Sequence, residues 1–240
     1  MLLFLSPSMI LIALAVIPAV ALMIYVYKAD RLDKESPQLL RALVLQGIFA
    51  TAVASLIEMV GERVLGIFLS SRTVAYQAIL YFGIVAFAEE GSKFVLLKNR
   101  TWRNPEFNCQ FDGVVYAVFV SLGFALWENV RYVLSYGFQT ALIRAVTAVP
   151  GHACFGVFMG VWYGVAKRFE GLRDPQSRNI CLALSLLLPA ITHGLYDYLA
   201  VMETGSREWI FFAFIAVLFF VSFRLVKSTS QKDKYIPRVY

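Results

Sequence analysis

The chain has 240 residues, of which 59% are hydrophobic and 16% are charged. Soluble domains carry about 25% charged residues, so this composition excludes a soluble globular protein. The net charge of +6 is spread over the ends of apolar runs, which excludes a nucleic-acid-binding surface as its explanation.

Seven apolar runs are long enough to cross a membrane, because a transmembrane helix needs about 20 predominantly apolar residues. In chain order the predicted spans are 7–27, 39–57, 74–97, 111–134, 141–166, 180–201 and 209–226. The connections between them are short, so we expect residues 1–240 to form a single domain. The predicted fold is all-α, a polytopic membrane helical bundle of about seven transmembrane helices.

Basic residues divide unevenly between the connections. Sixteen of the 22 lysines and arginines follow the first, third, fifth and seventh spans, whereas five, including Arg72, Arg144 and Arg207, lie on the other side. Cytoplasmic loops of membrane proteins carry an excess of lysine and arginine. We therefore predict that the N-terminus lies outside and that the C-terminus is cytoplasmic.

Two adjacent carboxylates, Glu89 and Glu90, lie inside the third span. A charge at bilayer depth costs at least about 2.5–3.5 kcal/mol on insertion scales, so such a pair needs a reason. Two close carboxylates resist double ionisation, and a shared proton suits general acid–base chemistry in a dry site. The alternative is a structural pair neutralised by Lys93, four residues after Glu89 on the same helical face.

Further ionisable residues follow in the next three spans. Glu128 lies in the fourth, His152 in the fifth, and His193 and Asp197 in the sixth, where their spacing of four places them on one helical face. Each also has a structural explanation: Glu128 could pair with Arg131, and each histidine could be a satisfied core residue. Intramembrane ionisable residues usually face a bundle interior or a water cavity, so we expect these groups to meet in one cavity.

The positions of these residues along their spans test that expectation. Glu89 lies about four residues to the cytoplasmic side of its span's centre, and Glu128 about five residues to the outer side of its own. At about 1.5 Å per residue the two would differ in depth by about 15 Å. Convergence on one site therefore requires the span boundaries to shift by several residues.

Other polar and small residues are interpreted as peripheral. Glu58 and Glu62 follow the second span and are read as residues of the outer rim, with gating or substrate contact as the alternative. Gly156, Gly160 and Gly164 repeat at a spacing of four, the small-residue pattern of close helix packing. We expect that packing to lie within the fold rather than between two copies.

The polar motifs, taken in order, resemble the PrsW family of bacterial intramembrane proteases, which is related to the prenyl-protein (CAAX) endopeptidases and bacteriocin-processing proteins. The residues that carry the resemblance are Glu89-Glu90-x-x-Lys93, Phe124-x-x-x-Glu128-Asn129, His152 and His193-x-x-x-Asp197. The resemblance covers about residues 74–198. It implies one transmembrane protease domain over residues 1–240, in which Lys93 and Asn129 support the catalytic residues. The catalytic residues it implies are Glu89, Glu90, Glu128, His152, His193 and Asp197.

The same resemblance implies a function. Members of the family make the first, extracytoplasmic cut in a membrane-anchored anti-sigma factor, in the regulated proteolysis of a stress response. The expected protein is therefore a multi-pass endopeptidase of the bacterial cell membrane. Its expected partners are the lipid bilayer and a single-pass membrane protein substrate, with no nucleic acid.

Two mechanisms fit these residues. Without a metal, Glu89 or Glu90 takes a proton from water while His193 donates to the developing oxyanion. Asp197 then either holds the imidazole of His193 or is protonated and donates itself. With zinc, Glu128, His152 and His193 are the candidate ligands, and the pair is the base beside the ion. The sequence leaves the cofactor open between none and zinc.

Two other classes of function compete with the protease. Intramembrane acidic residues and histidines also build proton relays in transporters and channels, although the inverted repeats and paired broken helices of transporters are not evident here. A non-catalytic scaffold on the same fold would keep the motifs only in part, whereas this chain has all of them.

Overall fold

The computed structural model describes residues 7–201 and 208–237, and within these ranges it contains helices and connections but no β-strand. Arg207 and Arg238, which contribute to the predicted topology, lie outside the described residues. The helices are α1 (Pro7–Ala29), α2 (Pro37–Phe68), α3 (Val74–Ala78), the π-helical η1 (Ile79–Val85), α4 (Ala86–Thr101), α5 (Asp112–Tyr136), α6 (Phe138–Val146), α7 (Ala148–Gly171), α8 (Pro175–Val201) and α9 (Glu208–Gln231).

The all-α membrane bundle is confirmed, with one span built differently from the prediction. Six helical segments are long and apolar enough to cross a membrane, the segment Phe138–Gly171 counting as one. The predicted span 74–97 is instead a helical run divided by η1, and its second half carries the Glu89–Glu90 pair and Lys93. The predicted span 141–166 is interrupted at Thr147, which separates α6 from α7.

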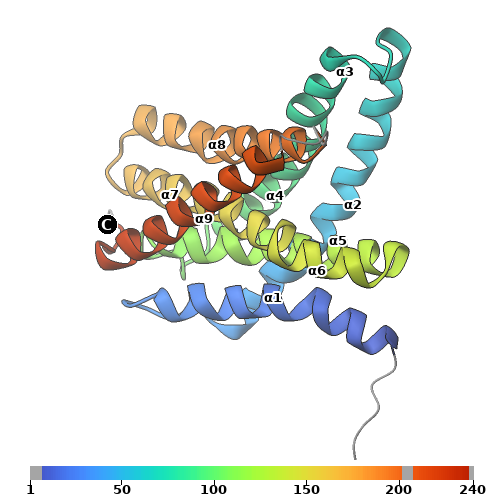
Figure 1. Ribbon diagram of the computed structural model, residues 1–240. Coiled ribbons are helices and arrows are strands. Elements are labelled where there is room, and N and C mark those ends of the chain that lie inside the picture. The colour runs from blue at the N-terminus through green and yellow to red at the C-terminus, as the bar shows by residue number, and fades with distance from the viewer. Residues whose placement is uncertain (1–6, 202–207, 238–240) are drawn as a thin grey trace, which may run out of the picture.

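Helix α2 is longer than predicted. Pro37 occupies its first turn and the Ser36 hydroxyl accepts from the Leu39 backbone N–H at 3.2 Å, a side-chain cap that starts the helix. The helix is 32 residues long and continues to Phe68, past the expected end at residue 57. At 1.5 Å per residue it is about 48 Å long, more than the roughly 30 Å hydrocarbon core. Glu58 and Glu62 are therefore helical, and the far end of α2 projects beyond the bundle with α3 (Figure 1).

Helix α5 is the centre of the bundle and is packed closely by glycines. A Cβ on Gly47 of α2 would lie 2.0 Å from the Val120 carbonyl oxygen, so only glycine allows that crossing. A Cβ on Gly160 of α7 would lie 2.4 Å from the Val114 Cα. The predicted packing of the glycine repeat within the fold is confirmed, because α5 and the residues before it contact all three members: Gly156, Gly160 and Gly164.

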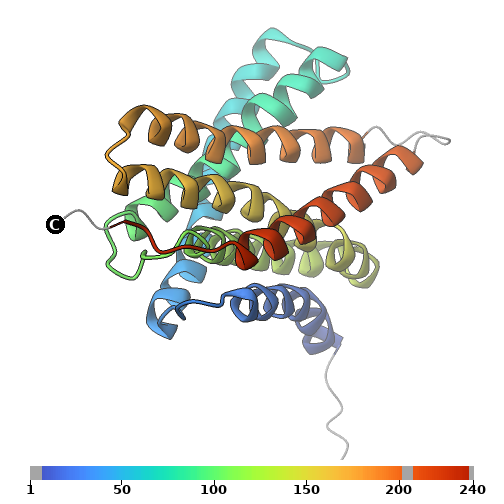
Figure 2. The ribbon, with the colours of Figure 1, turned by 90° about the vertical axis from the view of Figure 1, so that its left-hand side faces the viewer.

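The four connections that carry the excess of basic residues meet at one end of the bundle. They are the α1–α2 connection, the α4–α5 connection, the α7–α8 turn and the segment after α9, which carries the C-terminus (Figures 1 and 2). Hydrogen bonds join these regions in pairs: Ser36 N–H to Glu106, Gln110 N–H to the Lys234 carbonyl, and the Trp102 indole N–H to Glu170. We refer to this as the basic end of the bundle.

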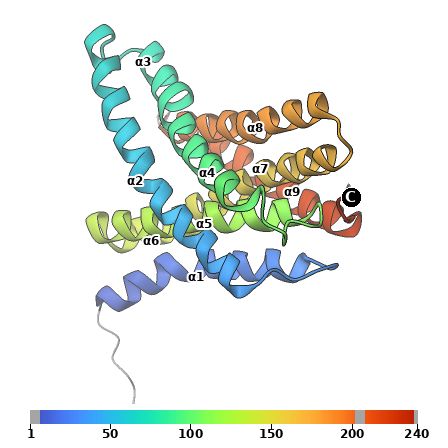
Figure 3. The same ribbon diagram turned by 180° about the vertical axis from the view of Figure 1, so that it is seen from behind.

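The helices are not parallel to one another. The axes of α5, α7 and α8 are roughly parallel, with α7 running in the opposite sense to the other two (Figure 1). Helix α2 and the α3–η1–α4 run form an antiparallel pair that crosses them steeply (Figures 1 and 3). Positions along α4 therefore do not translate directly into depth along α5. This geometry decides whether the polar residues of the different helices can meet.

Candidate active site

Glu89 and Glu90 lie in the first turns of α4, and Lys93 lies between their carboxylates. The Lys93 Nζ is 2.8 Å from Oε1 of Glu90 and 3.2 Å from Oε2 of Glu89. Lys93 and Glu90 are fully buried, and Glu89 is 6% exposed. The ammonium also lies 4.0 Å from the centroid of the Phe124 ring. Neutralisation by Lys93 explains how two adjacent carboxylates are tolerated inside the bundle.

His193 of α8 binds the carboxylate pair from the opposite side. Its Nδ1 lies 2.8 Å from Oε1 of Glu90, and because an ionised carboxylate only accepts, Nδ1 carries the proton and donates. Its Nε2 lies 3.5 Å from Oδ2 of Asp197 and 3.9 Å from Oε2 of Glu89. The ring stacks on Phe155 at a centroid distance of 4.5 Å. Glu90, more than Asp197, therefore fixes the orientation of this imidazole.

His152 of α7 connects Lys93 to Glu128. Its Nδ1 lies 3.1 Å from the Lys93 Nζ, and because an ammonium only donates, this Nδ1 is the acceptor. The other nitrogen, Nε2, then carries the proton and donates to Oε2 of Glu128 at 2.9 Å. The same carboxylate oxygen pairs with Arg144 at 3.0 Å. The cation beside Glu128 is thus Arg144, and not Arg131 as the sequence allowed.

Arg144 is the residue of this network that sequence reasoning missed. It lies in α6, and its guanidinium is 3.9 Å from the centroid of the Tyr132 ring. Its Nε donates to Oδ1 of Asn129 at 3.0 Å, while the Asn129 amide donates to the Ala15 carbonyl at 3.2 Å. Asn129 therefore supports Arg144. Its position as a lone arginine within the apolar stretch 141–166 was the sequence feature that could have indicated its place in this network.

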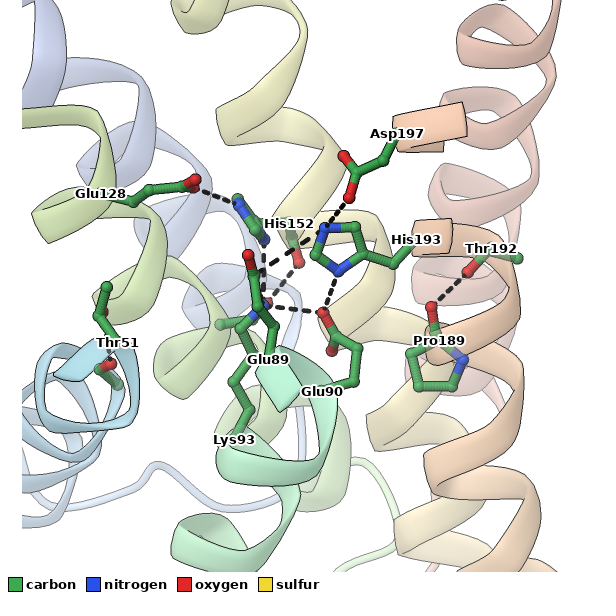
Figure 4. A network of polar contacts seen from close by, with 12 residues as sticks. Thr51, Glu89, Glu90, Lys93, Glu128, His152, Pro189, Thr192, His193 and Asp197 are labelled. Atoms are coloured by element: carbon green, nitrogen blue, oxygen red, sulfur yellow. Dashed lines mark hydrogen bonds and ion pairs between the residues drawn. The ribbon is translucent and has the colours of Figure 1, made fainter. Parts of the chain in front are cut away.

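Most of these groups line one cavity of about 330 Å³. Figure 4 shows Glu89, Glu90, Glu128, His152, His193 and Asp197 lying close together. The acidic and histidine residues of the cavity lining come from five helices that are distant in sequence: α2, α4, α5, α7 and α8. The polar and aromatic lining residues are Glu58, Tyr81, Glu89, Glu128, Tyr132, Arg144, His152, Phe155, His193, Tyr196 and Asp197. Glu58, interpreted from sequence as a rim residue, belongs to this lining, whereas Glu62 does not.

The 15 Å difference in depth expected between Glu89 and Glu128 does not keep them apart. Both carboxylates line the same cavity. With the observed bounds of 74–101 and 112–136, the expected difference falls to about 8 Å. The remaining difference assumes parallel helices, whereas α4 crosses α5 steeply. The steep crossing of α4 over α5 brings the start of α4 beside the second half of α5 (Figure 3).

The π-helical stretch η1 positions the pair. It ends at Val85, four residues before Glu89, and Tyr81 and Val85 line the cavity. Helix α8 approaches it closely, because a Cβ on Gly194 would lie 2.7 Å from the Phe82 ring. π-helical turns occur frequently at functional sites. Here the turn and the neighbouring glycine bring the start of α4 against His193.

The donor atoms at the centre fit a metal ion of the zinc class. Glu89, Glu90, His152 and His193 each offer one ligand atom, and these atoms all lie within 4.8 Å of one another. Two imidazoles with carboxylates form a known zinc donor set, and a carboxylate that holds the second nitrogen of a ligating histidine is its usual outer partner. Glu128 occupies that outer position on His152 and is not a member of the cluster among the described residues.

Two further observations bear on whether a metal ion fits these residues. Oε2 of Glu90 is buried and has no hydrogen-bond partner among the described residues, so an acceptor remains available. The Lys93 ammonium already contacts Glu89, Glu90 and His152, three of the four candidate ligands. A metal ion would share these atoms with Lys93.

The fold and the site together define a class of protein: a polytopic membrane enzyme whose acid–base groups are enclosed by the bundle. The family model of the PrsW family intramembrane metalloproteases matches residues 35–226. The chain belongs to this family and is an intramembrane protease of the bacterial membrane. Membership assigns it to the enzymes, and not to the transporters or scaffolds that the polar residues alone allowed.

Relatives named Protease PrsW are similar along almost the whole chain. The protein of Halalkalibacterium halodurans is 32% identical over 224 residues, which are 93% of this chain and 99% of that protein. The Bacillus subtilis protein is 30% identical over 223 residues, covering 93% and 96% of the two chains. The Clostridioides difficile protein is 28% identical over 231 residues, 94% of each. No solved structure matches the chain.

Proposed function

We propose that the whole chain, residues 1–240, works as one endopeptidase domain that hydrolyses a peptide bond of a single-pass membrane protein. The observation that carries the proposal is the position of Glu89, which lines the cavity beside His193 while Lys93 holds its charge inside the bundle. A membrane-anchored anti-sigma factor is the proposed substrate, on the resemblance of the motifs to the PrsW pattern.

The two carboxylates have different proposed roles because their surroundings differ. Glu89 lines the cavity and can reach water there, so it acts as the general base that accepts a proton from water. Glu90 does not line the cavity. Its Oε1 accepts from both Lys93 and His193, at 2.8 Å each, so it is the positioning residue that fixes these two donors.

His193 is the proposed donor to the developing oxyanion. With Nδ1 held by Glu90, its Nε2 faces the cavity side, where Asp197 lies 3.5 Å away. An N–H aimed at the point where negative charge develops stabilises the transition state more than the ground state. Asp197 favours the protonated form of this nitrogen, and Arg144, fixed by Glu128 and Asn129, is a second donor on the cavity wall.

Glu89, Glu90, His152 and His193 are the residues that would hold a metal ion. When bound, zinc supplies a Lewis acid that polarises a carbonyl group and lowers the pKa of water. Glu128 would still orient His152 through Nε2, and Glu90 would still orient His193 through Nδ1. His193 could then ligate the ion only through Nε2, and that nitrogen would no longer donate to the oxyanion.

The orientation in the membrane is proposed with the basic end cytoplasmic, the N-terminus outside and the C-terminus inside. A cysteine placed by Lys232→Cys, at the basic end, should resist a membrane-impermeant thiol reagent in intact cells and react after permeabilisation. The three native cysteines are buried, which limits background labelling. A cysteine placed by Arg72→Cys, in the α2–α3 connection, is the matched control that should react from outside. Labelling of position 232 in intact cells would reverse the topology.

The cavity supports a cut near the outer surface. Glu58, Arg144 and Asp197, which line it, lie in the halves of α2, α6–α7 and α8 that are remote from the basic end. A substrate helix must unwind locally there, because a helix in lipid satisfies its own amide groups.

Cleavage of a model anti-sigma factor should therefore leave a new terminus at the extracytoplasmic end of its span. Mass spectrometry of the fragments locates the bond, and a Glu89→Gln protein serves as the inactive control. A bond mapped to the cytoplasmic end of the span would contradict the proposed opening of the cavity.

A further inference from the structure

A second cluster of buried carboxylates lies at the basic end, away from the cavity. Asp30 follows α1, Glu35 precedes α2, and Asp112 is the first residue of α5. Their exposed fractions are 2%, 4% and 0%. One oxygen from each can be chosen so that all three lie within 4.8 Å of one another.

No cation in the described part of the chain contacts the carboxylates of the cluster. No ion pair among the described residues includes Asp30, Glu35 or Asp112. The nearby Lys34 ammonium contacts the backbone carbonyl oxygens of Tyr27 and Asp30 instead. Buried charges without a partner are costly, so three such carboxylates together call for a positive ligand.

Several of these carboxylate oxygens make no hydrogen bond with the described residues and are free to bind a cation. Both side-chain oxygens of Asp30 and Oδ1 of Asp112 are buried without a hydrogen-bond partner among the described residues. Oδ2 of Asp112 accepts from the backbone N–H groups of Asn108 and Cys109, at 3.0 and 2.7 Å, which fixes the direction of the free Oδ1. Oε2 of Glu35 accepts from the Tyr116 hydroxyl at 2.7 Å. Asp112 and Glu35 are thus held in place by donors that do not neutralise them, and the oxygens of Asp30 have no donor among the described residues.

The chemistry and spacing of these atoms select the ligand. Carboxylate oxygens are the preferred ligands of hard cations such as Ca²⁺ and Mg²⁺. Opposite ligands of Ca²⁺ are about 4.6–5.2 Å apart and those of Mg²⁺ about 4.0–4.2 Å, twice their usual bond lengths. Oxygens no more than 4.8 Å apart are close enough for one ion of either kind to bind all three.

We propose that Asp30, Glu35 and Asp112 bind one hard divalent cation, Ca²⁺ or Mg²⁺, which clips the start of α5 to both ends of the α1–α2 connection. Glu128 lies sixteen residues after Asp112 on α5, about 24 Å along the helix axis. The cation site is thus separate from the catalytic groups. Burial raises the pKa of Asp30 to about 6 and that of Glu35 to about 7, in keeping with a cluster that its own surroundings compensate poorly.

The test is a titration of the full-length protein in detergent, stripped with a chelator and then given Ca²⁺ or Mg²⁺ separately. Calorimetry should give one saturable site for at least one ion, with a rise in Tm on binding. Asp30→Asn and Asp112→Asn should each raise Kd at least about tenfold, because affinity depends on the number of charged ligands. Asp33→Asn is the matched control: Asp33 is exposed, and asparagine keeps an acceptor for the Asn108 amide.

A second readout does not depend on these variants folding. Tb³⁺ replaces Ca²⁺ in oxygen sites and emits when a nearby tyrosine is excited, so Tyr116 should sensitise it and Ca²⁺ should displace it. Tyr116→Phe should reduce the emission without abolishing Ca²⁺ binding. The proposal is overturned if the wild-type protein binds neither ion saturably, or if folded Asp30→Asn and Asp112→Asn proteins bind as the wild type does. Unchanged Ca²⁺ affinity in a Glu89→Gln protein would separate this site from the catalytic cluster.

Discussion

Replacing Glu89 by glutamine is expected to slow peptide cleavage by about 10²–10⁴-fold while the protein stays folded, because loss of a general base has an effect of this size. Glutamine keeps the shape of the side chain and can still accept from Lys93, but it cannot take a proton from water. The measurement is single-turnover cleavage of a model single-pass substrate in detergent or proteoliposomes, with Tm as the check on folding.

Glu62→Gln is the matched control for that experiment. Glu62 is an exposed glutamate of α2 outside the cavity, so its replacement should leave cleavage within about twofold of wild type. Glu90→Gln should also impair cleavage, through the lost orientation of His193. Zinc content, measured alongside, separates loss of a base from loss of a ligand. Full activity in both the Glu89 and Glu90 variants would remove the pair from the chemistry.

Much of the bundle could be predicted from sequence because membrane burial leaves a simple signal. Long apolar runs place the helices, and the distribution of lysine and arginine groups the four connections that the structure brings to one end. The internal geometry of residues 74–101 could not be predicted this way. A π-helical turn such as η1 depends on how α8 packs against Phe82 through Gly194, which is a contact between distant segments.

The arrangement of the site could also be predicted only in part. Spacing along one helix predicts which residues share a face, and Glu89 and Lys93, four apart, do meet. His193 and Asp197 also lie within 3.5 Å. Partners from different helices depend on crossing angles that a single sequence does not encode locally.

Two features therefore appear only in three dimensions. The pairing of Glu128 with Arg144 joins α5 to α6 through a contact that helical spacing does not predict. The carboxylate cluster at the basic end joins Asp30, Glu35 and Asp112, and Asp112 lies more than 70 residues from the other two. Neither Asp30 nor Glu35 differs in sequence context from an ordinary loop residue.

Lys93→Met is expected to destabilise the protein by about 3–5 kcal/mol, the usual cost of removing one partner from a buried ion pair. Lys93 is fully buried, contacts both carboxylates of the pair, and also holds Nδ1 of His152 at 3.1 Å. Methionine fills a similar volume but leaves two carboxylates facing each other without a cation. Equilibrium unfolding of chelator-treated protein in detergent gives the difference in free energy.

A control and a double variant show whether that loss comes from the charge. Lys98→Met, five residues further along α4, makes the same substitution where the side chain is partly exposed and should cost less than about 1 kcal/mol. Adding Glu90→Gln to Lys93→Met should recover part of the lost stability, because one of the uncompensated carboxylates is then removed. If the two substitutions instead add up, or if Lys93→Met unfolds like the wild type, Lys93 is not the counter-ion that keeps this pair inside the membrane. Because the same ammonium touches three of the four candidate metal ligands, recovery of the Lys93→Met protein by added zinc would mean that a metal ion can take over its charge.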